Sequence, residues 1–266
     1  MSANQPVVTA PPARFRLRVR FMKQGRLRYL GHLELIHTIE RCIRRAALPY
    51  AVSQGFSPHM RVGYTAALPV GTGSCCEYYD VFLTELVPAE EAFDRLKAAT
   101  PHDITPTAAA YVDLRAPALT AVITRLDYRI ELAFREGCAV SAQLLDDAVA
   151  TVRNAGELPY TRGKKRKTLD LSNLLSWETA EADGGSVTLG ISTRCDNEGS
   201  LRPELLLAAV DQVLRGIEPG SEEIVSTGIQ ELSRIARYRV MRTAQLVEGE
   251  DGAYLPPLQT EPMAKL

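Results

Sequence analysis

Apolar and basic residues alternate along Phe15–Phe21. A period of two is typical of a half-buried strand, with one face on the core and the other in solvent. The pattern therefore predicts a strand whose outer face carries Arg18 and Arg20, with Lys23 just beyond. It is expected to end at the Gln24–Gly25 break.

Residues 30–48 carry apolar side chains at helical spacing, among them Leu33, Ile36 and Ile43. This spacing predicts an amphipathic helix. Pro49 should end it, because the residue before a proline avoids the helical region. The outward face of this helix carries three arginines, Arg41, Arg44 and Arg45.

The rest of the first half is expected to hold short strands and one helix. Extended segments are predicted at residues 50–53, 61–68 and 78–86, a helix at 88–99, and a last strand at 104–112. Together with the first strand and helix, the order is β-α-β-β-α-β, which is that of a ferredoxin-like unit.

The second half repeats this order. Strands are predicted at 123–134, 168–175, 186–193 and 229–241, and helices at 141–154 and 201–214. An Asp-Gly-Gly turn at 183–185 would pair the two middle strands. We therefore expect an α+β fold of two tandem ferredoxin-like (βαββαβ) units with antiparallel sheets.

Composition suggests where these units begin and end. A Pro/Ala-rich N-terminal tail (residues 1–12) and an acidic, Pro-rich C-terminal tail (residues 247–266) are expected to be flexible. Between them, a basic first domain is expected over residues 13–118 and a second domain over residues 119–246.

The net charge of −1 hides an uneven distribution. Residues 1–70 hold eleven cationic side chains against two glutamates, a net charge of +9, which leaves −10 for the remaining residues. Such asymmetry indicates a surface for an anionic partner. The alternative is a basic half that packs against the acidic half of the same chain.

The cysteine and hydropathy patterns predict no metal site and no membrane partner. The spacing of the five cysteines fits no metal ribbon or redox pair, and the side chains of adjacent Cys75 and Cys76 should point to opposite faces of a strand. Reduced thiols without a signal peptide favour a cytoplasmic protein. No apolar run approaches the roughly 20 residues that span a bilayer.

Two histidines and a glutamate are candidates for acid–base chemistry. His32 lies at the start of the predicted helix, where backbone N–H groups could hold a phosphate; the alternative is a histidine that caps the helix or packs against the turn. His59 lies in the loop before residue 61. Glu77 follows a glycine-rich turn and could act as an acid or base, or pair with an arginine.

Residues 53–61 form the most unusual loop of the sequence. Gly55 permits backbone angles that other residues avoid, and the ring of Phe56 could stack on a nucleobase or plug the core. Pro58, His59 and Arg61 add rigidity, polar groups and charge. The loop is therefore a candidate for base recognition.

Residues 162–167 hold five positive charges in six positions, the densest basic run of the chain. Such a run suits contact with a polyanion, or is a solvated loop. Arginine makes bidentate contacts to phosphate, so the arginines of the first half could extend the same surface. The expected RNA footprint comprises Arg18, Arg20, Lys23, Arg41, Arg44, Arg45, Gly55, Phe56, Pro58, His59, Arg61, Lys164, Lys165, Arg166 and Lys167.

The stretch Phe21–Glu34 resembles the opening of the radical SAM-linked proteins, a bacterial domain family of unknown function. The similarity continues through residues 40–49, 53–58 and 68–78, and is specific over about residues 15–135. The sequence departs from the family pattern at Gly31, where the family usually has Ser, and at Glu34, where it usually has Asp.

The resemblance implies an accessory unit of a radical SAM enzyme that also carries a cobalamin-type domain. The iron–sulfur cluster, S-adenosylmethionine and cobalamin would belong to that partner, and no cofactor is expected on this chain, whose sequence lacks the three-cysteine cluster motif. Gene context in the family, near ribosomal-protein and ribonuclease genes, implies an RNA substrate such as tRNA or rRNA.

Three functions are consistent with these features. The first is a non-catalytic partner of a radical SAM enzyme that binds or presents RNA through an Arg-rich surface. The second is an RNA-processing or RNA-modifying enzyme that uses His32 or His59 as acid or base. The third is a module for protein interaction only.

Overall fold

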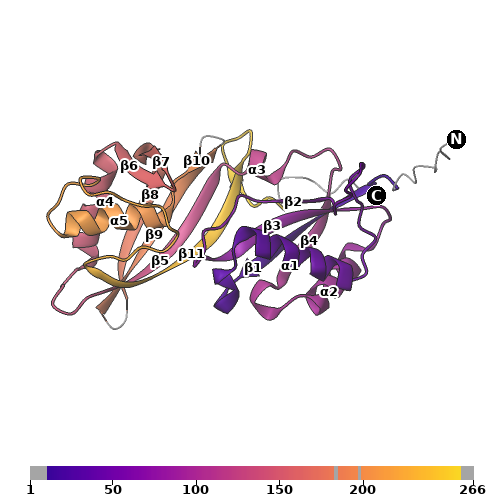
Figure 1. The fold of residues 1–266 in the computed structure, drawn as a ribbon, viewed down its shortest axis with the longest axis horizontal. Helices are drawn as coiled ribbons and strands as arrows, with labels where there is room; N and C mark the ends of the chain where they lie inside the picture. The colour runs from indigo at the N-terminus through magenta and orange to yellow at the C-terminus, as the bar shows by residue number, and fades with distance from the viewer. Residues whose placement is uncertain (1–10, 183–184, 197–198, 259–266) are drawn as a thin grey trace.

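The computed structural model describes residues 11–182, 185–196 and 199–258. In these residues the chain is a mixed α+β protein with five α-helices and one large, mostly antiparallel sheet. Figure 1 shows two lobes side by side, each with its own helices and strands.

The first lobe alternates strands and helices in the predicted order. Its elements are β1 (Phe15–Lys23), α1 (His32–Arg45), β2 (Val62–Tyr64), β3 (Gly73–Leu83), α2 (Ala89–Ala99) and β4 (Pro106–Val112). In space the strands run β4-β1-β3-β2, and each neighbouring pair is antiparallel.

The alternation in β1 directs Leu17, Val19 and Phe21 into the core of this lobe, where they are buried with side chains of α1 and α2. The core face of α1 carries Leu35, Ile39, Cys42 and Ile43, whereas Leu33, expected inside, is exposed. Helix α1 begins at His32, and the Glu34 carboxylate accepts the backbone N–H of Gly31 at 2.8 Å. This bond satisfies one of the backbone N–H groups that a helix start leaves without a partner.

The second lobe holds the same alternation with a hairpin inserted. Its elements are α3 (Leu119–Val122), β5 (Arg125–Phe134), α4 (Ala142–Asn154), β6 (Glu157–Arg162), β7 (Lys165–Asp170), β8 (Leu174–Ala182), β9 (Ser186–Asp196), β10 (Gly199–Ser200), α5 (Pro203–Leu214), β11 (Ile235–Glu248) and β12 (Tyr254–Leu255). The main strands run β8-β9-β5-β11, again antiparallel. The β6–β7 hairpin forms a sheet of its own.

The lobes are joined where β11 runs parallel to β3, with Met241 beside Gly73 and Arg242 beside Ser74. A side chain at Gly73 would bring its Cβ to 2.9 Å from Cε of Met241. A larger residue at this position would therefore have to displace the end of the Met241 side chain, which fills the space above Gly73.

One irregularity of β3 corrects a prediction. Between the pairs Phe21–Glu77 and Lys23–Ser74 the register shifts, so that Cys75 and Cys76 together stand opposite Met22. This is a β-bulge, in which two residues face one and the alternation of side chains is broken. The expectation that the two thiols point to opposite faces is wrong, because both lie against the backbone carbonyl of Arg242.

The ends of the chain lie only partly within the described residues. The expected N-terminal tail falls mostly in residues 1–10, and the 183–185 turn mostly in residues 183–184, both outside them. The segment from 247 begins inside β11, and Val247 and Glu248 pair with β12. In the described residues, no helix has the length and apolar character that a bilayer crossing requires.

Candidate functional site

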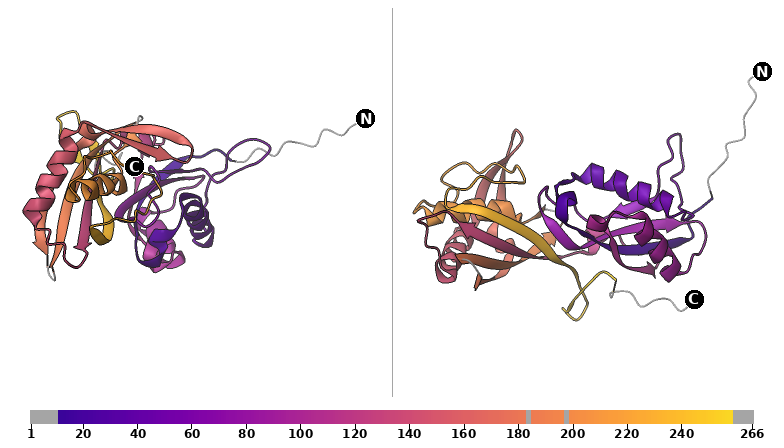
Figure 2. Two further views of the ribbon diagram at one scale, coloured as in Figure 1. Left: turned by 60° about the vertical axis from the view of Figure 1, so that its left-hand side comes forward. Right: turned by 90° about the horizontal axis from the view of Figure 1, so that it is seen from below.

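The loop after α1, residues 53–61, projects from the first lobe. Figure 2 shows it in purple, standing clear of the helices in both views. Its base is held by hydrogen bonds: Ser53 N–H donates to His59 O at 2.8 Å, and Ser53 Oγ accepts His59 N–H at 3.0 Å. Arg61 N–H then donates to Ala51 O at 2.9 Å. The chain thus leaves and re-enters the lobe at a fixed point.

Phe56 occupies the tip of this loop and is fully exposed, with a relative accessibility of 112%. The alternative that it plugs the core is therefore excluded. Gly55 precedes it with φ of +126°, a conformation that residues with a side chain rarely adopt, and no atom lies within 4 Å of where its Cβ would stand. Backbone conformation alone accounts for glycine at this position.

The arginines of α1 are exposed, as predicted, and lie shortly before this loop in the chain. Arg44 pairs with Glu40 one turn earlier at 3.3 Å, and Arg41 donates to the Thr38 hydroxyl at 3.1 Å. Both interactions lie in solvent, where an ion pair contributes little and is readily exchanged. Arg61, at the end of the loop, is also exposed, and its guanidinium stacks 4.5 Å from the ring centroid of Phe82.

Two members of the expected footprint, Arg18 and Lys23, are buried, which corrects the prediction of one continuous Arg-rich face. Arg18 is buried and binds the Asp80 carboxylate at 2.8 Å, and its other end donates to Pro257 O at 3.0 Å. Arg16 shares the same carboxylate at 2.6 Å. These strand arginines are covered by the segment after β4 and by the C-terminal segment, so they cannot contact a phosphate.

Lys23 is buried as well, and its ammonium donates to Leu30 O at 2.8 Å. Burial lowers the pKa of this lysine, while the nearby carboxylates of Glu77 and Glu34 oppose that shift. Arg20 is half-buried and faces the thiol of Cys75. Neither side chain belongs to the exposed surface around the loop.

The basic run of residues 164–167 is exposed but lies elsewhere. It forms the turn and the start of β7 in the β6–β7 hairpin, with Gly163 at φ of +60°. Figure 1 places this hairpin in the second lobe and α1 in the first. The expected footprint is therefore divided between two surfaces, and only the one around the 53–61 loop combines cations with an exposed aromatic ring.

The three candidates for acid–base chemistry are not brought together. His32 is half-exposed, with its ring centroid 6.3 Å from that of Tyr64. His59 lies in the exposed loop, 3.5 Å from the Ser57 hydroxyl. Glu77 is buried. Among the described residues, no hydrogen bond or ring contact connects any two of these three.

Glu77 instead anchors a buried polar cluster between the lobes. Its carboxylate accepts from Arg242 at 3.0 Å, from Gln245 at 3.2 Å and from the Thr65 hydroxyl at 3.2 Å. Arg242 also donates to the Tyr128 hydroxyl at 3.1 Å. Burial opposes the charge of Arg242, but Tyr128 and Glu77 raise the pKa of its guanidinium above the ordinary value. The geometry therefore supports the prediction that Glu77 pairs with an arginine, and that arginine is Arg242.

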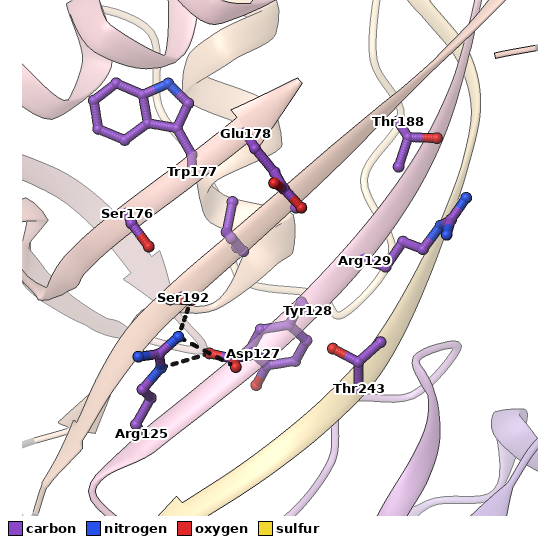
Figure 3. A pocket seen from close by; sticks show the side chains of 12 residues that line it. Arg125, Asp127, Tyr128, Arg129, Ser176, Trp177, Glu178, Thr188, Ser192 and Thr243 are labelled. Carbon is purple, nitrogen blue, oxygen red and sulfur yellow. Dashed lines mark hydrogen bonds and ion pairs between the residues drawn. The ribbon is translucent and has the colours of Figure 1, made fainter. Parts of the chain in front are cut away.

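Sequence reasoning missed a groove of about 630 Å³ on the second lobe. Figure 3 shows its polar side chains on β5, β8, β9 and β11. Arg125 is held by Asp127 at 2.8 Å and by the Ser192 hydroxyl at 2.9 Å. Glu178 lies over Gly190, where a Cβ would stand 2.9 Å from its Cγ. Carboxylates balance arginines here, so the groove is not a cationic surface. Its only sequence signal was the alternation of charged residues along β5.

In the described residues, no group of three or more His, Cys, Asp or Glu side chains is arranged to hold a metal ion.

Comparison with known proteins gives a family but no function. No curated protein matches the sequence. One similar solved structure is a chain of "Crystal Structure of a Cbf5-Nop10-Gar1 Complex", with 9% identity and a TM-score of 0.43, covering 86% of this chain and 48% of that one. This chain thus spans about half the length of that relative. Residues 16–203, more than half of the chain, match a family described as uncharacterised proteins conserved in bacteria, and the chain belongs to this family, DUF2344.

Proposed function

We propose that this chain is a non-catalytic subunit that binds RNA through the 53–61 loop and the exposed arginines of α1. The observation that carries the proposal is the full exposure of Phe56 at the tip of a loop with a hydrogen-bonded base. A phenyl ring left in water forgoes roughly 2 kcal/mol of burial free energy. An aromatic ring exposed at the tip of a loop whose ends are fixed is suited to stacking on an unpaired nucleobase.

The charge around the ring favours RNA over an uncharged protein pocket. Residues 41–61 contain four arginines and one histidine, and no carboxylate. Phosphates of a strand whose base stacks on Phe56 would meet these cations, and guanidinium groups bind phosphate in a bidentate manner. The footprint proposed here comprises Arg41, Arg44, Arg45, Gly55, Phe56, Pro58, His59 and Arg61.

We also infer that each lobe is a ferredoxin-like unit. The support is the strand order, with β1 between β4 and β3 in the first lobe and β5 between β11 and β9 in the second. In both lobes a strand and its helix are followed by two further strands, a second helix and a strand that returns beside the first.

For the partner, we propose a radical SAM enzyme with a cobalamin-type domain, in the cytoplasm. The support is the sequence resemblance of Phe21–Glu34 and the segments that follow it. The iron–sulfur cluster, S-adenosylmethionine and cobalamin would reside on that enzyme. A tagged chain should retain such an enzyme from bacterial extract, and its absence from the captured proteins would remove this part of the proposal.

Replacing Phe56 with alanine should weaken binding of a fluorescently labelled single-stranded RNA about tenfold, because a stacked base contributes about 1–3 kcal/mol. Fluorescence anisotropy measures the change. Leu33→Ala is the matched control: it removes another exposed apolar side chain, from the first turn of α1, and should leave affinity unchanged. Phe56→Trp should retain binding. Equal affinity of wild type and Phe56→Ala would contradict the proposed site.

The salt dependence of the same titration tests the arginines. For single strands, log K falls by about 0.7 per decade of salt for each phosphate neutralised. Arg41→Gln and Arg45→Gln should each flatten this slope. Lys165→Gln and Lys167→Gln, on the hairpin of the other lobe, should not. Binding that does not change with salt would exclude the phosphate contacts.

A further inference from the structure

The bulge in β3 brings two thiols together on an accessible part of the sheet. Cys75 Sγ lies 3.6 Å and Cys76 Sγ 3.7 Å from the same atom, the carbonyl oxygen of Arg242. Cys75 also approaches Thr243 O at 3.4 Å, and Cys76 approaches Ser74 Oγ at 3.6 Å. Both cysteines are free thiols, of which Cys75 is exposed and Cys76 is buried.

The two thiols differ in their electrostatic surroundings. A hydrogen bond from the Cys76 thiol lowers the pKa of Cys75 to about 6; partial burial opposes this shift, and the charge of Arg20 adds to it. The same hydrogen bond, together with burial and the charge of Glu77, raises the pKa of Cys76. Arg20 Nε is buried and has no hydrogen-bond partner among the described residues. Cys75 is therefore the more acidic thiol of the pair, and Cys76 is the less acidic one.

We propose that Cys75 is a reactive thiol that a peroxide oxidises, and that Cys76 is the thiol that resolves the product into a disulfide between the two neighbours. The charge of Arg20 favours thiol oxidation over metal binding at this pair of cysteines. A guanidinium beside the pair stabilises an anionic thiolate, but it repels a cation that two thiolates would otherwise hold. Exposure of Cys75 admits the peroxide, while burial of Cys76 keeps it protonated until Cys75 is oxidised.

The chemistry balances with hydrogen peroxide as the oxidant. The Cys75 thiolate attacks one peroxide oxygen, an S–O bond forms, the O–O bond breaks, and the departing hydroxide becomes water with one proton. Cys75 is then a sulfenic acid. The Cys76 sulfur attacks it, an S–S bond forms, the S–O bond breaks, and the hydroxide leaves as water with the Cys76 proton. Two thiols are oxidised and one peroxide is reduced to two waters.

Alkylation of the reduced full-length protein tests the reactive thiol. Iodoacetamide is applied in short pulses from pH 5 to 9, and labelling is read by mass spectrometry of the tryptic peptide 62–95, in which Cys75 and Cys76 are the only cysteines. Cys75 should label with a midpoint near pH 6. At pH 6.5 it should react at least about tenfold faster than Cys138, which also contacts an arginine at 3.3 Å but has no neighbouring thiol. Arg20→Gln should raise the midpoint and Arg20→Lys should largely restore it. A wild-type midpoint between pH 8 and 9 would overturn the proposal without any variant.

Treatment with one equivalent of hydrogen peroxide tests the resolving step. Peptide 62–95 should lose two hydrogens while the chain stays monomeric, and a dithiol reductant should reverse the change. In Cys76→Ser, a 1,3-dione should trap sulfenic acid on Cys75, whereas Cys75→Ser should yield neither product. Oxidation that falls equally on Cys138 and Cys195, or that links two chains, would overturn the assignment.

Discussion

Replacing Asp80 with asparagine should lower the free energy of unfolding by about 3–5 kcal/mol, although the side chain keeps its shape. The reason is that one buried carboxylate neutralises two buried guanidinium groups, those of Arg16 and Arg18. The amide would leave both cations without a counter-charge. Urea denaturation followed by circular dichroism measures the loss.

Asp94→Asn provides the matched control for Asp80→Asn. Asp94 is exposed on α2, so the same chemical change should alter stability by less than about 0.5 kcal/mol. A second variant identifies the cause. Changing Arg16 and Arg18 to methionine together with Asp80→Leu should recover most of the loss, because it removes the uncompensated charges. If Asp80→Asn proved as stable as wild type, the two arginines would not be buried against this carboxylate.

Glu77→Gln should destabilise the protein by a similar amount, about 3–5 kcal/mol, and should also uncouple the lobes. Glu77 belongs to β3 of the first lobe, and its partner Arg242 belongs to β11, the strand that joins the second lobe to it. Both side chains are nearly inaccessible to water. The glutamine amide keeps an oxygen that can accept from Arg242, but it has no negative charge, so the buried guanidinium loses its counter-charge.

The single tryptophan makes the uncoupling measurable. Trp177 lies on β8, where its indole N–H donates to Asp146 on α4, so its fluorescence reports on the second lobe. Circular dichroism reports on the whole chain. The two transitions should coincide in wild type and separate in Glu77→Gln. Glu131→Gln, at an exposed position of β5, should leave them coincident. Coincident transitions in Glu77→Gln would show that this cluster does not couple the lobes.

Much of the fold could be predicted because local patterns and tertiary packing agree. The strand from Phe15 and the helices ending at Ala99, Asn154 and Leu214 follow from apolar periodicity and end signals. The single strand predicted at 168–175 is two strands, β7 and β8, with a turn at residues 171–173, where the Asp170 carboxylate accepts Ser172 N–H at 2.8 Å. This local hydrogen bond turns the chain between β7 and β8.

The candidate site was less predictable, because burial depends on contacts distant in sequence. Alternating arginines in β1 predict an exposed face, yet Arg16 donates to Ala116 O and Arg18 to Pro257 O, so remote segments cover them. No pattern in the sequence around β1 predicts that Arg16 and Arg18 are buried. The basic asymmetry of the first half is partly neutralised within the same lobe, by Asp80 of β3. The sequence left open whether Phe56 is exposed for stacking or buried in the core, and the structure shows that it is exposed.

Photocrosslinking would test most directly whether the 53–61 loop binds RNA. The protein is irradiated with single-stranded RNA containing 4-thiouridine and digested with trypsin, which places the loop in the peptide 46–61. We predict nucleotide adducts on this peptide, centred on Phe56, that disappear in Phe56→Ala. Adducts confined to the β6–β7 hairpin or to the groove of the second lobe, with none on peptide 46–61, would contradict the account.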